Sequence, residues 1–118
     1  MCNFACMADA SIVEVRFYHS KPGRRDDFLE LFRRQARPAQ EAYGIKVLGP
    51  LLDLANPNVV VWLRSFPSED VRERMKQDSY EGPDWVSKLE ELVMPMLDDY
   101  SAVIAEATPG ALEGSLMH

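Results

Sequence analysis

The stretch that most constrains the fold runs from Val59 to Phe66 and reads Val-Val-Val-Trp-Leu-Arg-Ser-Phe. β-Branched and aromatic residues dominate it, and prolines at positions 57 and 67 bound it, which is typical of a β-strand between two turns. Side chains of a strand alternate between two faces. One face is aliphatic and is expected to pack beneath helices; it consists of Val59, Val61 and Leu63. The other face is mixed, and we look for function there; it consists of Val60, Trp62, Arg64 and Phe66.

A second strand is predicted from residue 11 to residue 19, because the same alternation occurs there. Its apolar face is expected against helices and consists of Val13, Val15, Phe17 and His19. Its mixed face consists of Ile12, Glu14, Arg16 and Tyr18. The mixed face carries a carboxylate, a guanidinium and a phenol at successive positions. We therefore expect the mixed faces of the two strands to line one interior.

Between these strands the sequence predicts a helix over residues 24–43. Phe28, Leu31 and Phe32 recur at helical spacing there. Pro38 lies inside the pattern, where it removes a backbone hydrogen bond, so the helix should be kinked.

The rest of the chain is read from its turn and capping residues. Gly49-Pro50 interrupts an apolar segment, which predicts a bent or irregular strand. Ser68 follows a proline and precedes two acidic residues, which is typical of a helix start. The elements predicted after the first helix are a strand over 45–54, the strand 59–66, a helix from Ser68 that ends before a loop at 78–82, a helix over 84–97 and a strand over 100–106.

The order βαββααβ predicts an α+β domain of the ferredoxin-like type, with a four-stranded antiparallel sheet spanning 11–106. Residues 1–10 are expected to form a disordered extension and residues 107–118 a loose tail. Helices would cover one face of such a sheet only. The other face would then expose apolar side chains, and a homodimer with two sheets packed face to face would bury them. The exposed set would be Ile12, Tyr18, Val60, Trp62 and Phe66.

Composition excludes several classes of function. The net charge of −6 argues against nucleic-acid and anionic-membrane surfaces, which need clustered positive charge. No apolar run approaches the roughly 20 residues of a membrane span, so we expect a cytoplasmic protein. Cys2 and Cys6 lie near the N-terminus, and the only histidines are His19 and His118, so we expect no metal site and no cofactor.

Several short motifs between residues 12 and 106 are informative in combination. They are Arg16-x-Tyr18-x-x-Lys21-Pro22-Gly23, Phe28-Leu29-Glu30-Leu31, Gly44-Ile45-x-Val47-Leu48-Gly49, Val60-Val61-Trp62-Leu63 with Phe66, a charged short helix with Arg72 and Arg74, and Asp84-Trp85 opening the last helix. Together these motifs resemble the NIPSNAP family. Membership would imply a dimeric α/β barrel, a fold whose superfamily includes cofactor-free monooxygenases, isomerase- and dehalogenase-like enzymes, and stress-related proteins.

One position departs from that family pattern. Many relatives carry a histidine about four residues before the aromatic residue that matches Phe66, and here that position is Trp62. If the histidine takes part in proton transfer in relatives, this chain cannot use it in the same way. The departure favours binding over acid–base catalysis.

The candidate site consists of the polar and aromatic residues of the two mixed faces. Arg16 or Arg64 would anchor an anion, Trp62 and Phe66 would stack on a ring, and Tyr18 would donate a hydrogen bond to a small aromatic or carboxylated molecule. Glu14 and Tyr18 are the candidates for acid–base catalysis, with burial raising the pKa of Glu14.

Two other interpretations stay open. In the first, Glu14 is an ion-pair partner of Arg16 or Arg64 at a dimer interface, with no part in chemistry. The protein as a whole is then a non-catalytic interaction or stress-response module whose interior is filled by side chains. Degradation of heme by a related barrel ranks below both, because the expected histidine ligand is missing.

Overall fold

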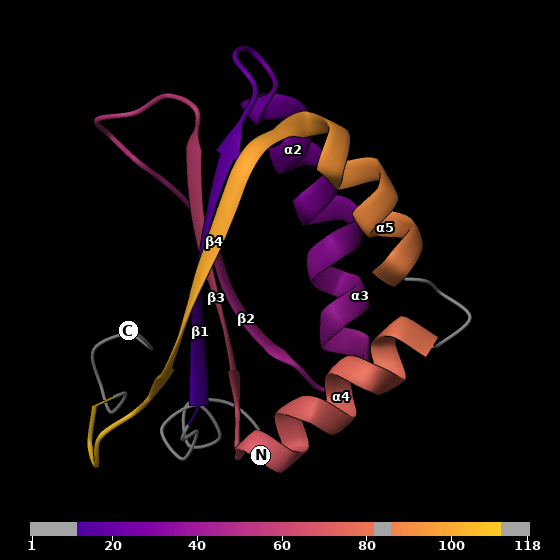
Figure 1. Ribbon diagram of the computed structural model, residues 1–118, viewed down its shortest axis with the longest axis vertical. Coiled ribbons are helices and arrows are strands. Elements are labelled where there is room, and N and C mark those ends of the chain that lie inside the picture. Colours follow the sequence, from indigo (N-terminus) through magenta and orange to yellow (C-terminus); the bar gives the residue numbers. More distant parts are fainter. Residues whose placement is uncertain (1–11, 82–85, 112–118) are drawn as a thin grey trace.

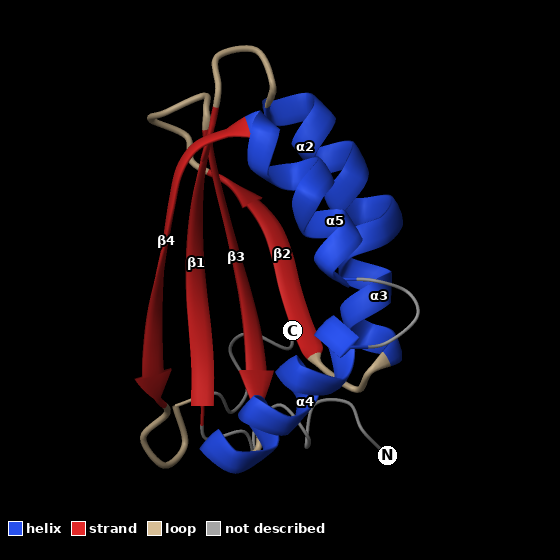
Figure 2. Cartoon of the chain, turned by 45° about the vertical axis from the view of Figure 1, so that its right-hand side comes forward, coloured by secondary structure: helices blue, strands red, loops and turns tan. Residues whose placement is uncertain are grey.

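The computed structural model describes residues 12–81 and 86–111. Four strands form one layer and the helices form a second layer on one side of it (Figures 1 and 2). The elements are β1 (Ile12–Ser20), α2 (Arg25–Leu31), the π-helical turn η1 (Phe32–Ala36), α3 (Arg37–Ala42), β2 (Lys46–Leu52), β3 (Val59–Phe66), α4 (Glu69–Glu81), α5 (Val86–Val93), the 3₁₀ turn η2 (Met94–Met96) and β4 (Leu97–Glu106).

The sheet is antiparallel with the strand order β2-β3-β1-β4. This order and the helices on one face confirm the predicted ferredoxin-like α+β fold. The predicted extension 1–10, most of the predicted tail and the predicted helix start at Asp84-Trp85 lie outside the described residues.

The strand and helix boundaries are close to those predicted. β3 has the predicted bounds, and β4 begins at Leu97 rather than Tyr100. The prediction of a loop at 78–82 is wrong for residues 78–81, because α4 continues to Glu81. At the start of α4, Ser68 Oγ accepts a hydrogen bond from the backbone N–H of Val71 at 3.2 Å, as expected of an N-terminal cap.

The helix predicted over 24–43 contains a π-helical turn immediately before its proline. In this turn the backbone N–H of Arg37 donates to the carbonyl of Phe32, five residues earlier. Pro38 has no N–H and its ring conflicts with the carbonyl four residues before it, at Arg34, so a wider turn accommodates it. Phe32 and Ala36, at the ends of η1, both face the cavity described below.

β2 is irregular where Gly49-Pro50 was predicted to bend it. Its pairing with β3 shifts between Leu48 and Leu51. Gly49 has a φ of +113°, and a Cβ there would lie 2.9 Å from Cβ of Trp62. Only glycine therefore fits between the two strands at this point.

The assignment of the two sheet faces from the sequence is wrong. The mixed face lies beneath the helices, where Val60 and Phe66 are fully buried and Trp62 packs against Phe32 with ring centroids 5.0 Å apart. Large side chains are needed to fill the space between a sheet and a helix layer, and aromatic residues supply the most buried area per residue. The smaller aliphatic side chains are on the face that no helix covers.

By the strand register, this uncovered face is apolar across all four strands. Val15 of β1 lies between Leu63 of β3 and Val103 of β4 in the pairing, and all three side chains therefore share the face. Val103 is 56% exposed. The set, which we call the open face, comprises Val13, Val15, Phe17, Leu48, Val61, Leu63 and Val103.

Candidate functional site

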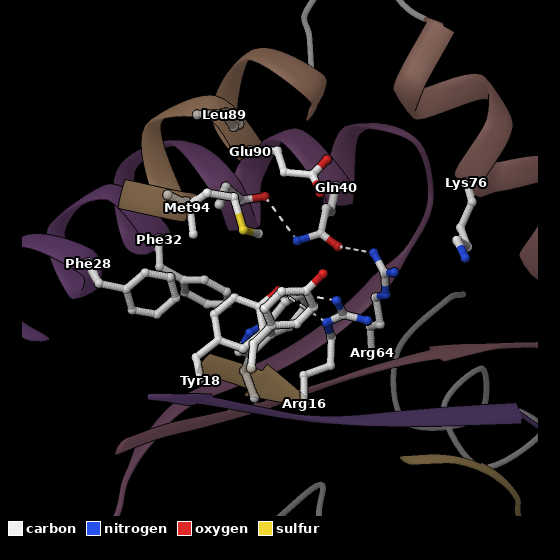
Figure 3. Close-up of a pocket in the computed structure, with 14 residues that line it drawn as sticks. Arg16, Tyr18, Phe28, Phe32, Gln40, Arg64, Lys76, Leu89, Glu90 and Met94 are labelled. Carbon is white, nitrogen blue, oxygen red and sulfur yellow. Dashed lines mark hydrogen bonds between the residues drawn. The ribbon is translucent and has the colours of Figure 1, made fainter. Parts of the chain in front are cut away.

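A cavity of about 230 Å³ lies between the sheet and the helix layer (Figure 3). Strand residues form its floor, and α2, η1, α3 and α5 contribute its walls. Its aromatic lining consists of Tyr18, Phe28, Phe32, Trp62 and Tyr100, and its polar lining of Arg16, Gln40, Arg64, Lys76 and Glu90. It lies within one chain, between the sheet and the helices, whereas the sequence predicts a cavity between the sheets of two copies.

Four of the predicted site residues line this cavity: Arg16, Tyr18, Trp62 and Arg64. Phe66 does not line it; its ring is fully buried in the core, 5.7 Å from the guanidinium carbon of Arg64. Glu14 also does not line it, and its carboxylate is enclosed by guanidinium groups. The two mixed faces are thus brought together as expected, but facing the helices.

Glu14 binds three arginines although none of its surface is exposed. Its Oε1 accepts hydrogen bonds from Arg16 Nη1 at 2.7 Å and Arg64 Nε at 2.8 Å, and its Oε2 accepts from Arg72 Nε at 2.6 Å. Arg72 comes from α4 and also pairs with Glu69 at 2.6 Å, at the protein surface. The cluster therefore joins β1, β3 and α4 through one carboxylate.

These contacts reverse the expected pKa shift of Glu14. Burial alone would raise the pKa of this carboxyl group, but the charge and hydrogen bond of Arg64, the hydrogen bond of Arg72 and the charge of Arg16 outweigh it and lower the pKa to about 2. Glu14 is therefore ionised at neutral pH and has no proton to give. The geometry corresponds to the ion-pair interpretation of Glu14, but the ion pairs form within one chain and not at a dimer interface. The expectation of a raised pKa is wrong.

Arg16 connects this cluster to Tyr18. Its Nε and Nη2 donate to the Tyr18 hydroxyl oxygen at 3.3 and 3.2 Å, and its guanidinium carbon lies 5.3 Å from the Trp62 ring centroid. Burial disfavours the charged form of Arg16, but Tyr18 and Glu14 more than offset this and raise its pKa. Arg16 thus stays charged while its side chain remains 17% exposed, more than that of Arg64 at 8%.

Gln40 and Trp62 complete the polar groups around Arg64. Gln40 Oε1 accepts from Arg64 Nη1 at 2.7 Å, and its Nε2 donates to the Ala36 carbonyl at 3.2 Å (Figure 3). The indole Nε1–H of Trp62 is buried and has no acceptor among the residues that the structure describes. A buried donor without an acceptor is unusual in proteins.

Sequence reasoning missed the helix-side half of the site. Phe28 and Phe32 were recognised as the buried stripe of the first helix, but not as cavity walls. Gln40 follows Phe32 and Ala36 at intervals of four residues, so an amide in line with the apolar stripe was the available signal, and it is 6% exposed in the structure. Glu90 and Tyr100 carry no such signal, because only the packing of α5 and β4 brings them to the cavity.

Other kinds of site find no support in the described part of the chain. No group of three or more histidine, cysteine, aspartate or glutamate residues there could hold a metal ion. Among the helices of residues 12–81 and 86–111, none is long and apolar enough to cross a membrane.

Solved structures with this fold come from several organisms. A NIPSNAP protein of unknown function from Agrobacterium tumefaciens superposes with a TM-score of 0.75 at 17% identity, over 93% of this chain and 96% of that one. A dimeric ferredoxin-like protein from an uncultured marine organism gives a TM-score of 0.66 at 9% identity, over 86% and 91%. A protein from Bacteroides thetaiotaomicron, provisionally named an antibiotic biosynthesis monooxygenase, gives 0.62 at 16% identity, over 86% and 91%.

Comparisons of sequence are more specific about the family. No curated protein matches this chain. The NIPSNAP family model matches residues 13–108, from the start of β1 to just beyond β4. That span includes the three strands that contribute to the cavity, β1, β3 and β4, and every helix of its walls. The chain belongs to the NIPSNAP family.

Proposed function

We propose that this protein is a homodimer that binds a small organic molecule, aromatic or carboxylated, in the cavity between the sheet and the helices of each protomer. The observation that carries the proposal is the cavity itself, about 230 Å³ lined by five aromatic rings and by Arg16 and Arg64. Apolar walls with a few convergent polar groups are typical of small-molecule sites. The open volume favours binding over the alternative of an interaction module with a filled interior.

Turnover without a cofactor is a second candidate, favoured by the position of Tyr18. Its hydroxyl oxygen accepts two hydrogen bonds from Arg16, so its own O–H is left to donate elsewhere. Glu14 is excluded as the acid by its lowered pKa, which leaves Tyr18 as the group for proton transfer. The fold neighbour named as a monooxygenase is consistent with this candidate at the level of fold only.

Filling the cavity tests the proposal. We expect ligand-observed NMR with a mixture of single-ring and short-chain aliphatic compounds to detect binding to the wild type. Ala36→Phe places a ring in the cavity and should abolish the binding, because Ala36 lines it. Ala42→Phe adds the same ring at an exposed position of α3 and is the matched control. Binding that survives Ala36→Phe, or no binding by any compound, would contradict the proposal.

The homodimer is proposed from the open face. Its apolar side chains form a continuous surface across four strands, which a second copy of the sheet would bury. We expect a dimer by light scattering, dissociated by Val103→Lys on the open face and unaffected by Leu92→Lys on the helix layer, where Leu92 is also about half exposed. A monomeric wild type would refute the dimer but not the cavity, which lies within one chain.

The proposal also keeps two expectations that come from the sequence. These are a cytoplasmic location and the absence of nucleic-acid binding, which follows from the net charge of −6.

A further inference from the structure

We propose that the ligand is a single-ring aromatic carboxylic acid, bound with its carboxylate at Arg16 and its ring among the aromatic walls. The inference rests on the proposed function and narrows it, because it selects the anionic members of the ligand class and excludes neutral and cationic ones. Three features of the cavity carry it: an imbalance of charge, unused hydrogen-bond donors, and size.

The imbalance of charge lies in the Glu14 cluster. Arg16 and Arg64 share a single carboxylate oxygen, Glu14 Oε1, at 2.7 and 2.8 Å. The other oxygen is taken by Arg72 at 2.6 Å. Arg72 is itself neutralised at the surface by Glu69 at 2.6 Å and Glu73 at 3.2 Å, so Glu14 supplies one negative charge to the two guanidinium groups at the cavity. A second anion would balance the remaining positive charge.

Other charged residues of the lining do not remove this excess. Lys76 from α4 and Glu90 from α5 both line the cavity and have opposite charges (Figure 3). The chain as a whole has a net charge of −6, so the positive lining is not a consequence of a basic composition. It is a local concentration of positive charge, as expected of an anion site.

The unused donors point to an acceptor in the cavity. The hydrogen bonds of Arg16 use its Nε–H, one N–H of Nη1 and one of Nη2. One N–H on each terminal nitrogen therefore remains, and Arg16 lines the cavity with 17% of its side chain exposed. Carboxylate oxygens accept from such donors.

The size and the walls select the rest of the molecule. A volume of about 230 Å³ is below the range of roughly 300–1,000 Å³ for sites of drug-sized ligands, so one ring with its substituent is the appropriate size. Tyr18 packs against Phe28, Trp62 and Tyr100 with centroid distances of 5.4 to 5.8 Å. A planar ring would add to this set of aromatic contacts.

Three isosteric probes test the inference by calorimetry. Benzoate, benzamide and benzamidine share one shape and carry charges of −1, 0 and +1. We expect benzoate to bind about 10- to 100-fold more tightly than benzamide, because a hydrogen bond to a charged group is stronger than one to a neutral group by an amount in this range. Benzamidine should bind more weakly than either. Equal affinities of benzoate and benzamide would overturn the inference.

Arg16→Gln then locates the effect. Glu14 keeps Arg64 and Arg72 as partners in this variant, and a thermal melt checks that it folds. The preference for benzoate over benzamide should disappear, while Arg16→Lys should keep part of it. Arg74→Gln removes the same charge from an exposed position of α4 and should change nothing. A preference that persists in Arg16→Gln would mean that the acid binds elsewhere, which refutes the inference.

Failure of the inference and failure of the proposed function give different results. If neutral or aliphatic compounds bind in the NMR experiment but benzoate has no advantage, the cavity binds small molecules and the choice of an acid is wrong. If no compound binds at all, both are wrong.

Discussion

Replacement of Glu14 by glutamine should destabilise the protein strongly at neutral pH. The amide keeps the size of the side chain but removes the only carboxylate that Arg16 and Arg64 are seen to share. The folded-state pKa is about 2, against 4.5 for an ordinary glutamate, and this difference corresponds to about 3 kcal/mol of folding free energy. Breaking a buried ion pair from one side costs about 3–5 kcal/mol in other proteins, which agrees.

The pH dependence of this difference follows from the direction of the shift. The folded protein favours the ionised form of Glu14 more than the unfolded chain does. The stabilisation is therefore fully present above about pH 4.5, where Glu14 is ionised in both states. It is lost as the pH falls from there towards 2, where Glu14 takes up a proton in the folded state as well. Glu14→Gln should therefore be much less stable than the wild type at pH 7 and nearly as stable close to pH 2.

Urea unfolding followed by circular dichroism, at one protein concentration and at several pH values, measures this difference. Glu73→Gln is the matched control, because Glu73 also pairs with Arg72 but is 67% exposed. An exposed pair of this kind contributes at most about 1 kcal/mol. Equal stability of Glu14→Gln and the wild type at pH 7, or a difference that grows as the pH falls, would refute the account of the cluster.

Two further predictions concern the backbone. Gly49→Ala should lower the free energy of unfolding by about 1–3 kcal/mol, since it forces an alanine to a φ of +113° with its Cβ against Trp62. Chemical denaturation measures this loss, and an unchanged midpoint would contradict the close approach of β2 to β3. Ser68→Ala should cost about 1 kcal/mol by removing the cap of α4, whereas Ser68→Asp should retain most of the stability; equal losses in both variants would mean that the side chain does not act as a cap.

Much of the fold could be predicted because local signals agree with one another. Val59–Phe66 is a β-branched run between prolines, and β3 has those bounds. Pro38 marks the irregular turn of the first helix, and Gly49-Pro50 marks the irregularity of β2. Each of these features depends on the conformational limits of a few neighbouring residues, which a sequence displays directly.

The orientation of the sheet could not be predicted in this way. Alternation shows that Arg64 and Trp62 share a face of their strand, but not whether helices cover it. The face under the helices was expected to be the aliphatic one, and burying arginine and glutamate there instead is costly. In this structure the cost is offset within the cluster, since Arg64 and Arg72 satisfy both oxygens of Glu14. Arg72 lies 58 residues from Glu14, and no local pattern indicates that pairing.

The contrast between the acidic chain and its positive cavity has a consequence for the speed of binding. The net charge of −6 acts over the Debye length of about 10 Å at moderate salt, whereas Arg16 acts on a ligand only in the cavity. An acid would therefore be repelled during approach and held after entry. Added salt would screen the approach more than the contact, so association would become faster with ionic strength, opposite to the behaviour of proteins that steer anions with a basic surface.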